Sequence, residues 1–240
     1  MDYIFLFLLF VVAFLYSSVG HGGASGYLAL MALFGMEPLI MRSSALTLNL
    51  FVAGTAFIAF YKGGYLKWKL IFPFIVTSVP MAYFGAQTQV DPKIYKIILG
   101  IFLLIAVGRM IYRPRDYEVS KDNNIIISLF IGATLGFFSG MIGIGGGIIL
   151  SPLLILLHWA NVKEAAAASA LFILLNSTAG LLGLYQAGYT PNPQLFIWVA
   201  FAFAGGLLGS WSGSFKLSIV RLQYLLAFVL MIASIKLFFT

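Results

Sequence analysis

The run Gly143-Ile144-Gly145-Gly146-Gly147 separates two strongly apolar segments of the chain. It has a twin, because a shift of 124 positions brings Gly22-Gly23 onto Gly146-Gly147. The same shift, without a gap, also brings Gly85 onto Gly209. The sequence therefore predicts a duplicated unit with a glycine break near the start of each copy.

The composition indicates a membrane protein. Of the 240 residues, 62% are hydrophobic and only 9% are charged, whereas about 25% are charged in an ordinary soluble domain. Apolar runs of about 17 to 25 residues recur, each long enough for a helix to cross the bilayer. Their polarity does not alternate with the period of two that a membrane barrel requires. We therefore expect an all-α polytopic membrane protein with the lipid bilayer as its surroundings.

Each copy is predicted to be a glycine-broken helical hairpin followed by three transmembrane helices. The segment after the first break, Ala24 to Phe34, would be only about 17 Å long as a helix, which is half a bilayer. A loop from Gly35 to Arg42 is expected after it. The expected full spans are Ser43–Tyr61, Leu70–Thr88 and Ile94–Ile111 in the first copy, and Ala165–Gln186, Leu195–Phe215 and Leu222–Phe239 in the second, which opens with Ile125–Ile142 and the short Ile148–Leu157.

The basic residues predict that the copies are inverted relative to each other. Placing the loop 62–69 and the polar linker 112–124 on the cytoplasmic side puts ten of the fourteen basic residues inside, as the positive-inside rule requires. The net charge of +7 is then an orientation signal, and no nucleic-acid partner is expected. The predicted organisation is a first repeat over 1–111, a cytoplasmic linker, and a second repeat over 125–240. Both termini are expected outside the cell (inner) membrane.

The two breaks predict an anion site. Broken helices in inverted repeats bring half-helix N-termini together near the midplane, where free N–H groups and the helix dipole favour negative charge. The alternative is that glycines only allow close helix packing, which we favour for Gly132, Gly136 and Gly205-Gly206 but not for the clusters at the breaks. The backbone positions predicted to bind substrate are Gly22, Gly23, Gly143, Gly145, Gly146 and Gly147.

Five side chains are candidate donors to the same anion: Ser18, His21, Ser25, Asn49 and Asn176. A hydroxyl near a helix break often bonds back to a helix carbonyl, and a lone histidine is often structural. A side-chain amide near the middle of a span, as in Asn49 and Asn176, is energetically unfavourable when it faces lipid. It should therefore face a partner helix or the substrate pathway. Binding and packing therefore both stay open for these residues.

The absence of acidic residues from the predicted spans favours an anionic substrate, since neither a carboxylate relay nor an acidic cation cage is present. No nucleotide motif, metal site, cofactor or catalytic residue is expected. An anion channel is the main alternative to a transporter. An intramembrane hydrolase using Ser139 and His158 lacks the Gly-x-Ser-x-Gly elbow. A structural membrane partner and a homo-oligomer also stay open.

The serine- and glycine-rich breaks, 17–23 and 139–147, together with Ala168-Ser169-Ala170-Leu171 and Tyr185-Gln186-Ala187-Gly188, resemble the sulfite exporter TauE/SafE family over nearly the whole chain. The resemblance implies a permease for small inorganic or organic sulfur anions, such as sulfite, thiosulfate or organosulfonates. Members export or import, so the direction of transport does not carry over.

Overall fold

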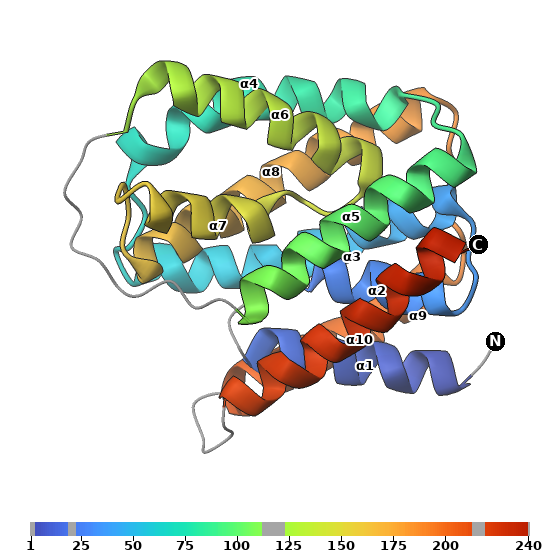
Figure 1. Cartoon of the computed structure of the whole chain (residues 1–240). Coiled ribbons are helices and arrows are strands. Elements are labelled where there is room, and N and C mark those ends of the chain that lie inside the picture. The colour runs from blue at the N-terminus through green and yellow to red at the C-terminus, as the bar shows by residue number, and fades with distance from the viewer. Residues whose placement is uncertain (1–2, 19–22, 112–122, 213–218, 240) are drawn as a thin grey trace.

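The computed structural model describes residues 3–18, 23–111, 123–212 and 219–239, and all regular structure within them is helical (Figure 1). This confirms the predicted all-α class. Most of the predicted linker 112–124 lies outside the described residues. The helices of the first half are α1 (Tyr3–Ser18), α2 (Ala24–Leu33), α3 (Pro38–Lys62), α4 (Trp68–Gln87) and α5 (Pro92–Ile111). Those of the second half are α6 (Ile125–Ile142), α7 (Gly147–Leu156), α8 (Val162–Gln186), α9 (Leu195–Ser212) and α10 (Ile219–Phe239).

The two halves contain helices of matching order and length. Both α2 and α7 have 10 residues, and both α3 and α8 have 25. The shift of 124 positions that aligns the sequence motifs also carries the bounds of α3 onto those of α8. The inverted relation between the halves stays a prediction.

Five helices among the described residues, α3, α4, α5, α6 and α8, are long and apolar enough to cross a membrane. Shorter apolar helices accompany them, including α1 and the half-length α2 and α7. The start of α1 and the end of α10 lie at one end of the bundle in Figure 1, and α6 begins at the other. The chain is therefore a multi-pass membrane protein.

The predicted loop from Gly35 to Arg42 is wrong beyond Glu37, because α3 already begins at Pro38. Proline is favoured in the first helical turn, where its missing N–H costs nothing and its fixed φ suits the helix. Arg42 therefore lies inside α3, about one turn from its start. Likewise α8 begins before the predicted Ala165, because Asn161 and Glu164 form a capping box at its N-terminus.

Glycines bring the helices of the two halves into close contact. Helix α6 packs on α4, and α1 packs on α9, so each half contributes one helix to each pair. A Cβ on Gly132 or Gly136 would run into the α4 backbone, and one on Gly205 would run into the α1 backbone at Phe10. This confirms the packing interpretation of these three glycines. Gly206 differs, since a Cβ there would make only an ordinary contact, 3.9 Å to Val52 Cγ2, so close packing does not require a glycine at this position.

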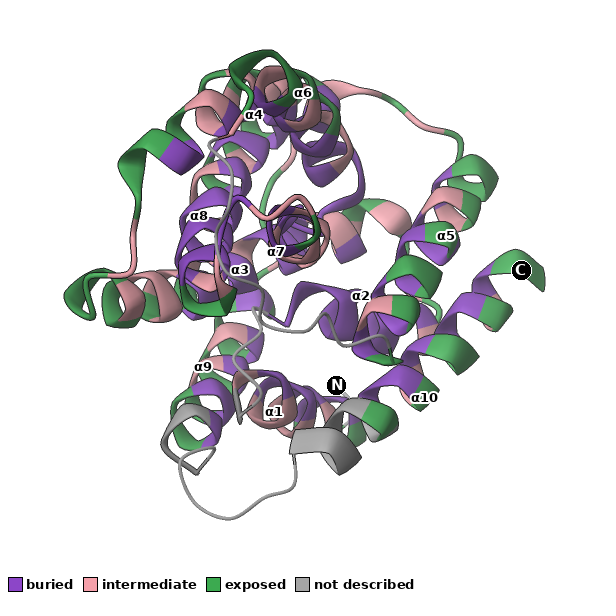
Figure 2. Cartoon of the chain, turned by 60° about the vertical axis from the view of Figure 1, so that its left-hand side comes forward, coloured by how far each residue is buried: buried purple, intermediate pink, exposed green. Residues whose placement is uncertain are grey.

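The remaining contacts place the half-helices at the centre of the bundle. The two 25-residue helices α3 and α8 pack against each other, and α5 packs on α10. Helix α7 is seen end-on at the centre of Figure 2, and it contacts both α8 and α5. The start of α7 is thus enclosed by protein, as irregular backbone at membrane depth must be.

Candidate functional site

The second glycine break is a tight reversal between α6 and α7. Gly143 ends α6 with φ 90°, and Gly146 precedes α7 with φ 74°. Gly145 between them has φ 78°, so this segment needs the left-handed conformation that only glycine adopts cheaply. The first hydrogen bonds of α7 are accepted by Gly146, which leaves the amides of Gly147 and Ile148 without an acceptor in their own helix.

This break lies about halfway along the bundle. A Cβ built on Gly145 would be 2.9 Å from Asn49 Nδ2 and 2.9 Å from Ile173 Cγ2. Asn49 is near the middle of α3, and Ile173 is near the middle of α8. The second break therefore lies beside the middle of both long helices, with α3 on one side and α8 on the other.

The first break is described from Gly23 onward. Gly23 has φ 79° and precedes α2, as Gly146 precedes α7. The buried Ser25 lies in the first turn of α2, and its Oγ is 2.8 Å from Tyr16 Oη on α1. The predicted site residues His21 and Gly22, and the side chain of Ser18, lie outside the described residues.

One cavity of about 280 Å³ is lined by the first turns of both half-helices. Its lining includes Gly23 and Ser25 of the first break and Gly147 of the second. The rest of the lining comes from Tyr16, Ala24, the C-terminal half of α3 (Ala53, Ala56, Phe60), Arg109, Ile144, Ile148, Ser151 and the N-terminal half of α8 (Val162, Lys163, Ala166, Ser169, Ala170, Ile173). The two predicted breaks are thus brought together at a single cavity.

The charges that line this cavity are positive. Arg109, in the last turn of α5, is partly buried, and its Nε makes no hydrogen bond within the part of the chain that the structure describes. Lys163 lies nearer the outside, with Nζ 3.1 Å from Tyr65 Oη and 4.8 Å from the centre of the Tyr65 ring. No Asp or Glu belongs to the lining among the described residues. The site can therefore combine backbone N–H groups with one guanidinium for an anion.

Arg109 is not among the site residues predicted from the sequence, because its place near a span end groups it with the charges of the cytoplasmic side. A signal was available. Two apolar residues, Met110 and Ile111, follow Arg109 before the linker begins, and this places Arg109 inside the final turn of the span. A cation in that position of a membrane helix either extends to the interface or faces a polar partner or a cavity.

The other predicted residues lie outside the cavity lining. Asn49 is buried, and its Nδ2 is 3.4 Å from Ser177 Oγ. Asn176 is also buried, and neither its oxygen nor its nitrogen has a hydrogen-bond partner among the described residues. Gly143 lies against the Arg42 backbone, and Gly146 lies against the Phe172 ring.

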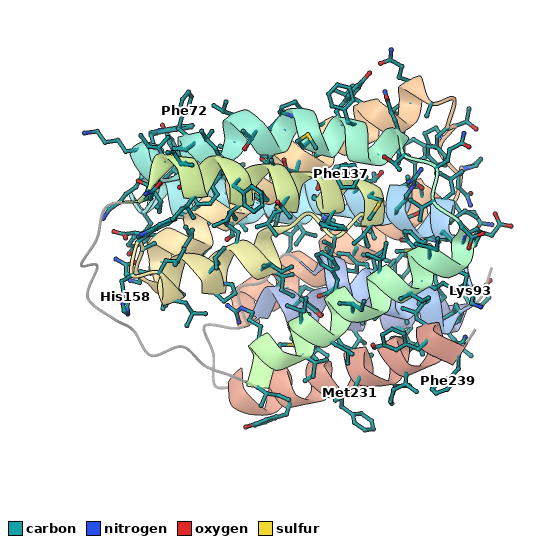
Figure 3. The ribbon with its side chains drawn as sticks, turned by 45° about the horizontal axis from the view of Figure 1, so that its top comes forward. Phe72, Lys93, Phe137, His158, Met231 and Phe239 are labelled. Atoms are coloured by element: carbon teal, nitrogen blue, oxygen red, sulfur yellow. The ribbon has the colours of Figure 1, made fainter. Side chains whose placement is uncertain are left out.

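The alternative pair Ser139 and His158 is not joined by a hydrogen bond. The buried Ser139 Oγ has no partner among the described residues. His158 follows the end of α7 and lies at the left end of the bundle in Figure 3. A nucleophile and its base should be within hydrogen-bond reach, so this arrangement gives no support to a serine hydrolase.

A comparison with protein-family models matches residues 5–237 to the sulfite exporter TauE/SafE model. The chain belongs to the sulfite exporter TauE/SafE family. The match covers both glycine breaks and the whole cavity lining.

Relatives of the chain are described as probable membrane transporter proteins. The "Probable membrane transporter protein y4hK" of Sinorhizobium fredii is 35% identical over 234 residues, which are 95% of this chain and 94% of the relative. A protein of Methanocaldococcus jannaschii with the same description, MJ0441, is 32% identical over 148 residues, 55% of this chain and 54% of that protein. Bacillus subtilis YunE is 23% identical over 196 residues, 73% of this chain and 72% of YunE. No solved structure matches the chain.

Proposed function

We propose that this TauE/SafE protein transports a small sulfur-containing oxyanion, such as sulfite, thiosulfate or an organosulfonate, through the cavity between the two glycine breaks. The observation that carries the proposal is that the first turns of α2 and α7 line one cavity together with Arg109. Each first turn offers backbone N–H groups and the positive end of a helix dipole. Arg109 adds a fixed positive charge with a planar fork of donors.

The hydroxyls of the cavity are the proposed neutral donors. Ser25 and Tyr16 share one hydrogen bond, so the pair still has acceptor and donor capacity for a bound oxygen. The Oγ of Ser169 is buried in the lining and makes no hydrogen bond within the described chain. A buried hydroxyl without a partner is costly, and an oxyanion in the cavity would satisfy it.

The size and charge of the cavity favour a small anion. A volume of about 280 Å³ is near the lower limit of pockets that enclose drug-sized ligands, roughly 300–1,000 Å³. The lining has two basic residues and no acidic one among the described residues. The sulfur-containing class follows from the family name, and the backbone donors suit any oxyanion of this size.

The proposed transport mechanism uses the duplicated architecture. The matching helix orders of the two halves, and a cytoplasmic 112–124 linker between repeats 1–111 and 125–240, are compatible with inverted copies in the cell (inner) membrane and with both termini outside. In such folds one repeat rocks against the other around a fixed site. The cavity, which is lined by the end of α3 and the start of α8, would then face the cytoplasm in the present state.

Thermal stabilisation of the detergent-purified protein by ligands tests the binding site. A ligand that binds only the folded state stabilises it by RT ln(1 + [L]/Kd). Sulfite, thiosulfate and methanesulfonate should raise the melting temperature more than phosphate or acetate at equal ionic strength. Arg109→Gln should weaken the binding of the best anion by roughly tenfold to a hundredfold, because charged hydrogen bonds contribute about 1.5–3 kcal/mol.

Lys93→Gln is the matched control, because Lys93 is an exposed cation at the end of the bundle away from His158 in Figure 3. This variant should show the same rise in melting temperature with each anion as the wild-type protein. Equal stabilisation of the wild-type protein and Arg109→Gln by every anion would contradict the site.

A further inference from the structure

A second cavity, of about 540 Å³, lies at the other end of the bundle. Helix α3 lines it with its first residues, whereas the last residues of α3 line the cavity between the breaks. Helix α5 behaves in the same way, with Tyr95 and Lys96 in the second cavity and Arg109 in the first. We call this second cavity the outer vestibule. Its lining is Gly35, Met36, Glu37, Pro38, Leu39, Arg42, Gln89, Val90, Pro92, Tyr95 and Lys96.

Buried apolar side chains separate the outer vestibule from the first cavity. On α3, Ala45 and Leu48 lie between the residues that line the two cavities, and on α5 Leu99 and Leu103 do. All four belong to one hydrophobic core. In this state the outer vestibule is therefore reached from its own end of the bundle and not through the first cavity.

Arg42 is the cation at the inner end of this vestibule. Its Nη1 lies 3.4 Å from the Thr88 carbonyl oxygen and 3.5 Å from the Met141 carbonyl oxygen. Both distances exceed the 2.7–3.2 Å of a normal N–H···O bond. Thr88 follows the end of α4 and Met141 lies in the last turn of α6, so each carbonyl contributes only part of a negative charge.

The donors of Arg42 are therefore largely unused. A guanidinium has five N–H groups, and within the described residues Nη1 alone makes hydrogen bonds. Lys96 adds a second cation to the lining, and Glu37 is the one carboxylate among the described lining residues. The net positive charge and the planar donor fork fit a small oxyanion.

We propose that the outer vestibule is a second, weaker binding site for a small oxyanion, centred on Arg42. The inference rests on the proposed function, because it gives the transported anion a site on the other side of the apolar barrier. The bound anion accepts hydrogen bonds from the Arg42 N–H groups that do not contact the Thr88 and Met141 carbonyl oxygens. Arg42 is then the residue that selects for negative charge at this end of the pathway.

Single cysteines provide the test, because the chain has no cysteine of its own and each introduced thiol is unique. Gln89→Cys places a thiol in the outer vestibule, and Ala56→Cys places one in the first cavity. Each thiol is alkylated in detergent with iodoacetate and, separately, with iodoacetamide. Both reagents react with the thiolate, but iodoacetate is negatively charged and iodoacetamide is neutral. The ratio of their rates at one thiol therefore reports the local electrostatic potential, because the thiolate fraction is the same in both reactions.

Arg42→Gln should lower the iodoacetate-to-iodoacetamide ratio at Gln89→Cys by roughly threefold to tenfold, the effect of one nearby charge, and leave the ratio at Ala56→Cys unchanged. Methanesulfonate should slow the alkylation of Gln89→Cys by iodoacetamide, and Arg42→Gln should abolish this protection. Lys93→Gln removes an exposed charge near the vestibule and should change the ratio less than twofold, because such charges are screened.

The proposal fails if Arg42→Gln leaves both the rate ratio and the protection at Gln89→Cys intact, or if Lys93→Gln has the same effect. Protection at Gln89→Cys without protection at Ala56→Cys would support the Arg42 site and contradict the binding site between the glycine breaks. Protection at Ala56→Cys alone would support the first cavity and overturn the Arg42 site.

Discussion

Tyr16 Oη lies 2.8 Å from Ser25 Oγ, and this buried contact joins the end of α1 to the first turn of α2 across the first glycine break. Both residues also line the cavity between the breaks. The hydrogen bond therefore holds the first turn of α2 against α1 beside the cavity.

Tyr16→Phe should destabilise the protein by about 1 kcal/mol, because it leaves the buried Ser25 hydroxyl without this partner. Thermal unfolding in detergent measures the loss. Tyr224→Phe is the matched control, since Tyr224 is exposed, and it should change the melting temperature little. If the two variants melt alike, the contact does not hold the first break.

The order of the helices and the two breaks could be predicted from the sequence, because the glycine runs stop long apolar segments and repeat at one spacing. The start of α3 could not be predicted in this way. The apolar pattern begins near Ser43, while the helix begins at Pro38 because of local proline chemistry.

The cavity residues were only partly predictable. Gly23, Ser25 and Gly147 line it as the glycine breaks suggested. Arg109 is not among the predicted residues, because a cation near a span end also satisfies the positive-inside rule, although Met110 and Ile111 after it place it inside the helix. Asn49 contacts the second break instead of the cavity, since the direction of a side chain around a helix depends on tertiary packing.

Gly140→Ala tests the packing of α6 on α4. A Cβ at this position would overlap the Ala82 carbonyl, a backbone group that cannot move aside cheaply. The expected cost is about 1–3 kcal/mol of stability, seen as a lower melting temperature. Gly108→Ala is the control, because no atom lies within 4 Å of a Cβ there. It should be neutral or stabilise α5 by up to about 1 kcal/mol. Equal melting temperatures for the two variants would contradict the close approach.

Substitutions of Glu164 test what stabilises the N-terminus of α8, whose first residues line the cavity. Its carboxylate accepts a hydrogen bond from the Asn161 backbone N–H and lies 2.7 Å from Lys67 Nζ. Glu164→Gln keeps the capping bond but loses the ion pair to a half-exposed lysine, so it should cost less than about 1 kcal/mol. Glu164→Ala loses both and should cost about 1 kcal/mol more. Thermal unfolding distinguishes them, and a larger loss in Glu164→Gln would show that the ion pair dominates.

Transport by Gly147→Ala in proteoliposomes shows whether the substrate passes between the two glycine breaks. Gly147 begins α7 and lines the cavity, and a Cβ there would be 2.5 Å from Ile173 Cδ1 and 3.0 Å from the Ser169 carbonyl oxygen. The added methyl group narrows the cavity where the α7 amides meet it. Exchange of radiolabelled thiosulfate across the bilayer is compared with that of Gly54→Ala, whose Cβ would make only an ordinary contact at 3.9 Å to Leu174. Gly147→Ala should slow exchange at least about tenfold, equivalent to about 1.4 kcal/mol, while Gly54→Ala should exchange like the wild type. Wild-type exchange by a folded Gly147→Ala protein would contradict transport through the glycine breaks.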